Sequence, residues 1–143
     1  MLDPRRLTAS FTAAPQIAPE DLAELKRQGF ALVINNRPDG EEPGQPVGAE
    51  IEAAAHAAGL AYCAIPVAGG FAQPQVEAMA LALQGGNGPV FAFCRSGTRS
   101  TLLWALAQAS TGGDPDEIAA AAAAAGYDIA PVRAAVEQLA VTF

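Results

Sequence analysis

The segment from Pro89 to Thr111 limits most strongly what this chain can fold into. Residues 89–93 (PVFAF) form a short, wholly apolar run, which is typical of a strand covered on both faces. Residues 100–111 carry apolar side chains nearly all round a helical wheel, which predicts a central, buried helix. The loop between them, residues 94–99, is therefore expected at the end of a strand and the start of a helix.

Helix and strand signals alternate along the rest of the chain. Such alternation predicts an α/β fold with a mostly parallel central sheet, right-handed crossovers and helices on both faces. The length of 143 residues fits a single domain over 1–143, and the C-terminal third is predicted to be helical. Buried strands are expected at 30–35 and 61–67, and helices at 19–28, 49–58, 74–83, 115–125 and 131–140.

Three predicted loops should meet at one edge of this sheet. They follow Asn35 and Val67, and the third begins at Cys94. Ligands of open α/β sheets bind at the carboxyl ends of the strands. The sequence therefore predicts a functional site at this edge.

Charge and cysteine content narrow the possible partners. The formal net charge of −7 argues against nucleic acid, but three of the eight basic residues, Arg37, Arg95 and Arg99, lie in or beside the predicted site. A small anion is the expected ligand. Two cysteines, no signal-peptide pattern and no membrane-length apolar run favour a soluble, cytoplasmic protein without a membrane partner.

Cys94 is predicted to be a reactive thiolate. Backbone N–H groups of residues 95–98 and of the first helical turn can point into one concavity, and the helix dipole adds positive potential there. That field stabilises a thiolate. Arg99 can offer a planar fork to an oxyanion, and Ser100 can cap the helix or donate to the thiolate. The predicted anion-binding loop comprises Arg95, Ser96, Gly97 and Thr98. The simpler alternative for Cys94 is a small buried hydrophobic residue, which is what an isolated cysteine at a strand end usually is.

The run CRSGTRS resembles the active loop of the rhodanese sulfurtransferases and, less closely, that of the cysteine-dependent dual-specificity phosphatases. A wider pattern, comprising VINNRPDGEEPGQP, IPV, FCRSGTRSTLLWAL and a late GYD, resembles the DUF442 family, the beta-lactamase hydrolase-like phosphatase-like domains. This resemblance runs from about Pro15 to the C-terminus. It implies a fold similar to dual-specificity phosphatases, with Cys94 as nucleophile and Arg99 as oxyanion ligand.

Three departures from the phosphatase pattern argue against efficient hydrolysis of phosphate esters. Arg99 lies five residues after Cys94 rather than six, Phe93 replaces a frequent histidine, and Ala68–Gly70 lacks the expected carboxylate. Expelling an alkoxide without a general acid is slow. The first expectation is thus a sulfurtransferase that carries a persulfide on Cys94, acting on a small sulfur-bearing anion or a persulfide.

Two alternatives remain open. One is a cysteine-dependent phosphatase acting on phosphate monoesters, with a proton donor among Asp39, Glu41 and Glu42; the other is a non-catalytic anion-binding module. A solvated acidic loop is the simpler interpretation of those carboxylates.

The accessory residues carry weaker signals. Arg37 follows a strand and could reach the anion, and Asp39 is a possible accessory acid. His56 fits a helix surface, and Cys63 fits the core. No cluster has metal-ligand spacing and no glycine pattern indicates a nucleotide, so neither a metal nor another cofactor is expected.

Overall fold

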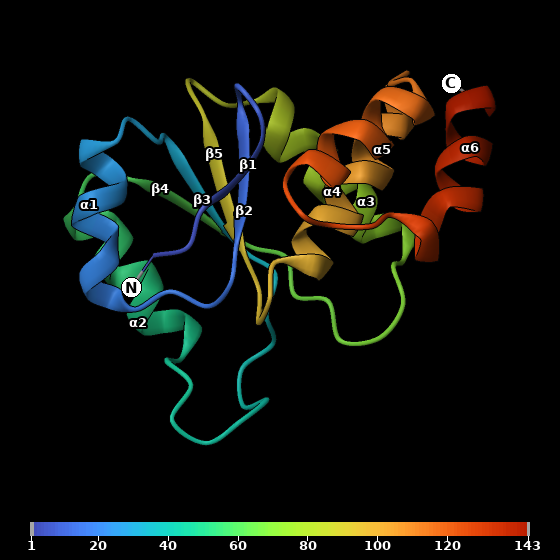
Figure 1. The fold of residues 1–143 in the computed structure, drawn as a ribbon. Helices are drawn as coiled ribbons and strands as arrows, with labels where there is room; N and C mark the ends of the chain where they lie inside the picture. The colour runs from blue at the N-terminus through green and yellow to red at the C-terminus, as the bar shows by residue number, and fades with distance from the viewer. Residues whose placement is uncertain (1, 143) are drawn as a thin grey trace.

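The computed structural model describes residues 2–142 and contains one five-stranded sheet (Figure 1). The strand order is β1-β2-β5-β3-β4, and only the β1–β2 pair is antiparallel. The central, mostly parallel sheet of the predicted α/β fold is therefore confirmed. The strands are β1 (Arg5–Thr8), β2 (Phe11–Ala14), β3 (Leu32–Asn35), β4 (Ala61–Ala64) and β5 (Val90–Phe93).

Helices cover both faces of the sheet, as the alternation of signals predicts. Figure 1 shows α1 (Leu22–Arg27) and α2 (Gly48–Ala57) on one side of the sheet and the other four helices on the opposite side. The C-terminal third is helical, which confirms that expectation. The remaining helices are α3 (Gln73–Gln84), α4 (Thr98–Ser110), α5 (Pro115–Ala124) and α6 (Arg133–Thr142), with short 3₁₀ turns at Pro19–Asp21 and Ala130–Val132.

β5 lies at the centre of the sheet and contributes to two apolar cores. Phe91 and Phe93 pack in the cluster beneath α1 and α2, whereas Val90 and Ala92 pack in the larger cluster beneath α3 to α6. Side chains alternate between the two faces of a strand. All four residues are buried, so the pairing register of this strand is fixed. The fixed register sets the position at which Cys94 follows the strand.

α4 is the buried central helix that the apolar pattern predicts, since nine of its 13 residues are buried. Trp104 stacks on Phe11 of β2, with ring centroids 5.6 Å apart. The helix begins at Thr98 rather than at Ser100, and its N-cap residue is Gly97 in the left-handed region with φ 93°. The expected cap by Ser100 is therefore wrong, because two further residues continue the helix toward Cys94.

Two features of the sheet differ from the expectation. β1 and β2 carry no strong strand signal, yet β2 pairs in parallel with β5 along its whole length. β4 is an edge strand whose residues are exposed or half-buried, so the prediction of a buried strand at 61–67 is wrong there. Within residues 2–142, no helix has the length and apolar character that crossing a bilayer requires.

Candidate active site

The three predicted loops do meet at the carboxyl ends of the parallel strands. The N–H of Asn36 donates to the carbonyl of Phe93 over 2.9 Å, and the N–H of Val67 donates to the carbonyl of Asn36 over 2.9 Å. A fourth segment joins them, because the N–H of Cys94 donates to the carbonyl of Ala14 at the end of β2 over 3.4 Å. The N-terminal strands therefore help to build the site.

Cys94 lies at the base of the loop and is fully buried. The backbone N–H of Gly97 donates to its Sγ over 3.1 Å. The loop thus aims one of its donors directly at the proposed nucleophile.

Four further backbone donors of the loop are available to a ligand. Among residues 2–142, the N–H groups of Arg95, Ser96, Arg99 and Ser100 donate to no protein acceptor. The N–H of Thr98, in contrast, donates to the side chain of Ser96 over 3.3 Å. Unpaired N–H groups at a helix start form a cradle for an oxyanion.

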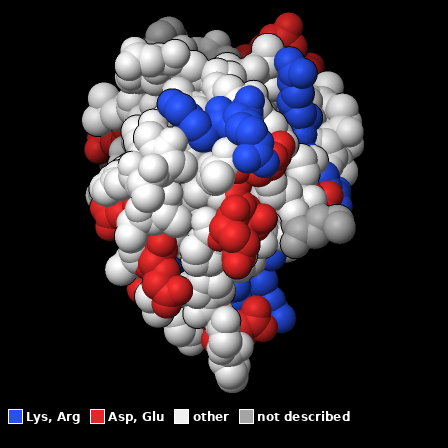
Figure 2. Space-filling view, turned by 90° about the vertical axis from the view of Figure 1, so that its left-hand side faces the viewer, with Lys and Arg blue, Asp and Glu red and all other residues white. Residues whose placement is uncertain are grey.

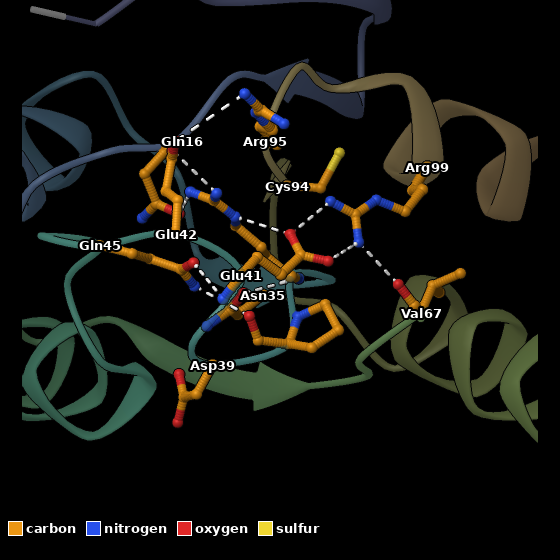
Figure 3. A network of polar contacts seen from close by, with 12 residues as sticks. Gln16, Asn35, Asp39, Glu41, Glu42, Gln45, Val67, Cys94, Arg95 and Arg99 are labelled. Carbon is orange, nitrogen blue, oxygen red and sulfur yellow. Dashed lines mark hydrogen bonds and ion pairs between the residues drawn. The ribbon is translucent and has the colours of Figure 1, made fainter. Parts of the chain in front are cut away.

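Arg99 is held with one edge of its guanidinium toward Cys94 (Figure 3). Its Nη1 donates to Glu41 Oε2 and to the carbonyl of Val67, both over 2.7 Å, and its Nη2 donates to Glu41 Oε1 over 2.8 Å. A guanidinium has five N–H donors. Nε and the second hydrogen of Nη2 therefore remain for the two oxygens of a bound anion.

Glu41 is a fixed anion between two arginines. Hydrogen bonds from Arg99 and then from Arg37 lower the pKa of Glu41 from 4.5 to about 2. The loop is exposed, as a solvated acidic loop would be, but Glu41 is also held by two ion pairs that this interpretation does not include. Because Glu41 is ionised at neutral pH, it orients Arg99 and has no proton to donate in this arrangement.

The Arg37 guanidinium is bound by side chains of the neighbouring loops. Its side chain is only 1% exposed, and its guanidinium donates to Gln16, Glu41 and Glu42 over 3.0, 2.9 and 2.9 Å. Burial alone would lower the pKa of Arg37, but the bonds to Glu41 and Glu42 outweigh it and raise the pKa. Arg37 thus anchors the acidic loop with two of its five N–H donors and holds Gln16 with a third, and its contact with an anion stays a prediction.

Two carboxylates, Glu41 and Glu42, offset part of the positive charge of the three arginines at the site. The exposed Arg95 lies 3.8 Å from Glu42, and Arg99 is paired with Glu41. Figure 2 shows the side that carries α1 and α2; basic side chains gather near its top, and in its lower part a basic group lies directly beside acidic ones. The predicted gathering of arginines is present, but paired carboxylates neutralise much of its field.

Two predicted site residues have other partners. The carboxylate of Asp39 accepts the N–H of Gly48 over 2.8 Å and points away from Cys94 in Figure 3. The hydroxyl of Ser100 donates to Asn36 Oδ1 over 2.7 Å, rather than to the Cys94 sulfur. Asn36 in turn donates to the carbonyl of Ile65 over 2.9 Å, so Ser100 ties α4 to the loops after β3 and β4.

Several residues of the site carry no signal that was recognised in the sequence. Gln16 and Asn36 contact Arg37 and Ser100, and Tyr127 donates to the carbonyl of Ser96 over 3.0 Å. The late GYD motif contains Tyr127, but the motif alone does not indicate the contact of Tyr127 with Ser96.

The remaining candidates lie away from the reaction centre. His56 is exposed on α2, as expected. Cys63 is half-buried on β4, and burial raises the pKa of its thiol. β3 separates β4 from β5, so about 10 Å of sheet divides Cys63 from the strand leading to Cys94, too far for a disulfide. The described residues contain no group of three or more potential metal ligands.

Comparison with known proteins identifies relatives of most of the chain. The family profile described as "Beta-lactamase hydrolase-like protein, phosphatase-like domain" matches residues 3–111. A beta-lactamase hydrolase-like protein of Agrobacterium fabrum is 42% identical over 108 residues, which cover 75% of this chain and 25% of that protein. The chain thus spans about a quarter of the length of the curated relatives it matches.

Solved structures share the architecture. A Neisseria meningitidis protein provisionally named a phosphatase has a TM-score of 0.80 and 32% identity, with 94% of this chain and 96% of that chain covered. Pseudomonas aeruginosa TpbA, solved with phosphotyrosine, has a TM-score of 0.64 and 17% identity, with 94% and 86% covered. The fold is that of the protein tyrosine and dual-specificity phosphatases, as the sequence resemblance implies.

Proposed function

We propose that this chain, which belongs to the phosphatase-like domain family of the beta-lactamase hydrolase-like proteins, is a cysteine-dependent phosphatase. Its substrates are phosphate monoesters. One observation carries the proposal. The Cys94 sulfur accepts the N–H of Gly97, belongs to a loop with four N–H groups that are unpaired within residues 2–142, and lies beside the free edge of Arg99. A phosphoryl group seated there would have its oxygens on these donors and its phosphorus above the sulfur.

The reaction would proceed in two displacements. The Cys94 thiolate forms a bond to phosphorus while the bond from phosphorus to the ester oxygen breaks, and the leaving alkoxide or phenoxide takes a proton from water or an acid. Water then attacks the phosphocysteine, releasing phosphate and the thiolate. Arg99 and the loop amides stabilise the charge on the equatorial oxygens in both steps.

The leaving group limits the choice of substrate. Glu41 is ionised, Asp39 points away from Cys94, and Ala68–Gly70 carries no carboxylate. Without a protonated acid in place, esters of acidic alcohols react fastest. The favoured substrates are therefore aryl phosphates, including phosphotyrosine, which is the ligand that TpbA binds in its solved complex.

Sulfur transfer is the second candidate, and the missing proton donor is the observation that favours it. A thiolate attacking thiosulfate expels sulfite, which needs no proton, and leaves a persulfide on Cys94. The comparisons support a phosphatase and give no support to a sulfurtransferase, so the order expected from sequence is reversed.

The deciding experiment runs both reactions on one preparation. We expect wild-type protein to hydrolyse para-nitrophenyl phosphate and a phosphotyrosine peptide, and acid quenching to trap a phosphate mass increment on Cys94. Cys94→Ser should abolish both, whereas Cys63→Ser is the matched control and should retain them. Sulfur transfer from thiosulfate to cyanide with no phosphatase activity would overturn the proposal.

A further inference from the structure

Tyr127 fixes the direction of one peptide unit in the Cys94 loop. Its hydroxyl donates to the carbonyl of Ser96 over 3.0 Å, while the N–H of Gly97 donates to Cys94 Sγ over 3.1 Å. These two groups belong to the same peptide unit. The carbonyl and N–H of a trans peptide unit point in opposite directions. Holding the Ser96 carbonyl on one side therefore holds the Gly97 N–H toward the sulfur on the other.

Gly97 makes such a restraint necessary. Its φ of 93° lies in a region that glycine enters and leaves freely, so the backbone itself does little to fix the adjoining peptide unit. The Tyr127 phenol fills the space beside it. A Cβ at position 97 would overlap the phenol oxygen and lie 2.9 Å from Cζ.

The fold places Tyr127 with several independent contacts. Gly126, with φ 93°, reverses the chain after α5, and the Tyr127 N–H donates to the carbonyl of Ala122 over 2.9 Å. The Arg5 guanidinium lies over the ring, 5.9 Å from its centroid, in cation–π geometry. Burial raises the pKa of the Tyr127 phenol, so the hydroxyl keeps the proton that it donates.

We propose that Tyr127 is a positioning residue of the catalytic loop, which keeps the Gly97 N–H directed at the Cys94 thiolate through the Ser96–Gly97 peptide unit. The inference rests on the proposed function in one respect, since it takes Cys94 to react as a thiolate. If this unit turned over, a carbonyl oxygen would replace the N–H beside a negative sulfur, and the two negative groups would repel each other.

Tyr127 lies beyond residue 111, where the family match ends. The C-terminal segment thus completes a loop that the matched region carries.

Tyr127→Phe keeps the ring and removes only the hydroxyl. We would measure iodoacetamide alkylation of Cys94 by mass spectrometry at about pH 6 and about pH 9, on either side of the pKa of an ordinary thiol. The ratio of the low-pH to the high-pH rate should fall about three- to tenfold, the range expected when one hydrogen bond is lost. The kcat for para-nitrophenyl phosphate should fall by a similar factor, with KM little changed.

The chain supplies its own controls. Cys63 in the same molecule should be alkylated at an unchanged ratio. Tyr62→Phe removes the other tyrosine hydroxyl, which accepts a hydrogen bond from Asn35 over 3.0 Å, and should leave the Cys94 ratio unchanged. A change in mere access to the sulfur would alter both rates equally and not their ratio.

An unchanged Cys94 ratio in folded Tyr127→Phe would overturn the proposal. Should that variant not fold, the wild-type protein still provides a test: the NMR signal of the Gly97 amide must move as Cys94 ionises, and an amide that does not respond would refute the geometry. Both readouts need no phosphate ester. Absent phosphatase activity with a changed ratio would therefore refute the proposed function and leave the role of Tyr127 standing.

Discussion

Glu41→Gln tests whether the ion pair between the acidic loop and Arg99 stabilises the site. Glutamine keeps the shape and one acceptor oxygen but loses the charge. The fall in the pKa of Glu41 from 4.5 to about 2 corresponds to about 3 kcal/mol in favour of the charged form. Solvent reaches 27% of the side chain and screens the pair, so we expect roughly 1 kcal/mol of stability.

The pH dependence of this stability has a definite sign. A carboxyl whose pKa is lower in the folded state stabilises the fold above its ordinary pKa, and that stability is lost as pH falls toward the folded value. The difference between wild type and Glu41→Gln should therefore be full above about pH 5 and vanish near pH 2. In thermal unfolding it amounts to about 3 °C at neutral pH.

The assay is thermal or urea unfolding of both proteins across this pH range, with Glu77→Gln on the exposed surface of α3 as control. The variant should also lose kcat/KM for an aryl phosphate, because Arg99 loses its fixed orientation. Stability curves of wild type and Glu41→Gln that stay parallel down to pH 2 would refute the reasoning.

Three further predictions concern the loop and the core. Arg99→Lys should weaken vanadate binding about tenfold to a hundredfold in calorimetry with little loss of stability, since lysine lacks the fork; equal affinity would mean that Arg99 does not face the anion. Gly97→Ala should cost about 1 to 2 kcal/mol in urea unfolding and abolish activity, because φ is 93° and Tyr127 fills the space. Gly69→Ala, in open space, should do neither. Trp104→Ala should lower the free energy of unfolding by about 3 to 5 kcal/mol. A decrease of less than about 1 kcal/mol would show that neighbouring core side chains fill the cavity.

The sequence predicts most reliably where local pattern and tertiary role agree. β5 is apolar on both faces and α4 is apolar nearly all round because both are central, so their burial and the loop between them could be inferred together. The start of α5 also follows from local chemistry, since Asp114 accepts the N–H of Glu117 as an N-cap.

What could not be predicted depends on partners distant in the chain. β1 (RRLT) and β2 (FTAA) are four residues each and mix polar with apolar side chains, so only pairing with the sheet makes them strands. The role of Glu41 could not be predicted for the same reason, because its partner Arg99 is distant in sequence. Its pairing with Arg99 leaves no periodic trace, and an acidic loop with glycine and proline is most simply interpreted as solvated.

The pairing of β2 with β5 has a consequence for the order of folding. Phe11 pairs with Val90 and Ala14 pairs with Phe93, so β2 lies 79 residues before the strand that it pairs with, which is more than half of the 143 residues. Contacts so distant in sequence form slowly, and until this pairing forms one edge of β2 has no neighbouring strand. The nucleophile follows β5 directly. The N–H of Cys94 donates to the carbonyl of Ala14 at the end of β2, so pairing of β2 with β5 also fixes the start of the reactive loop.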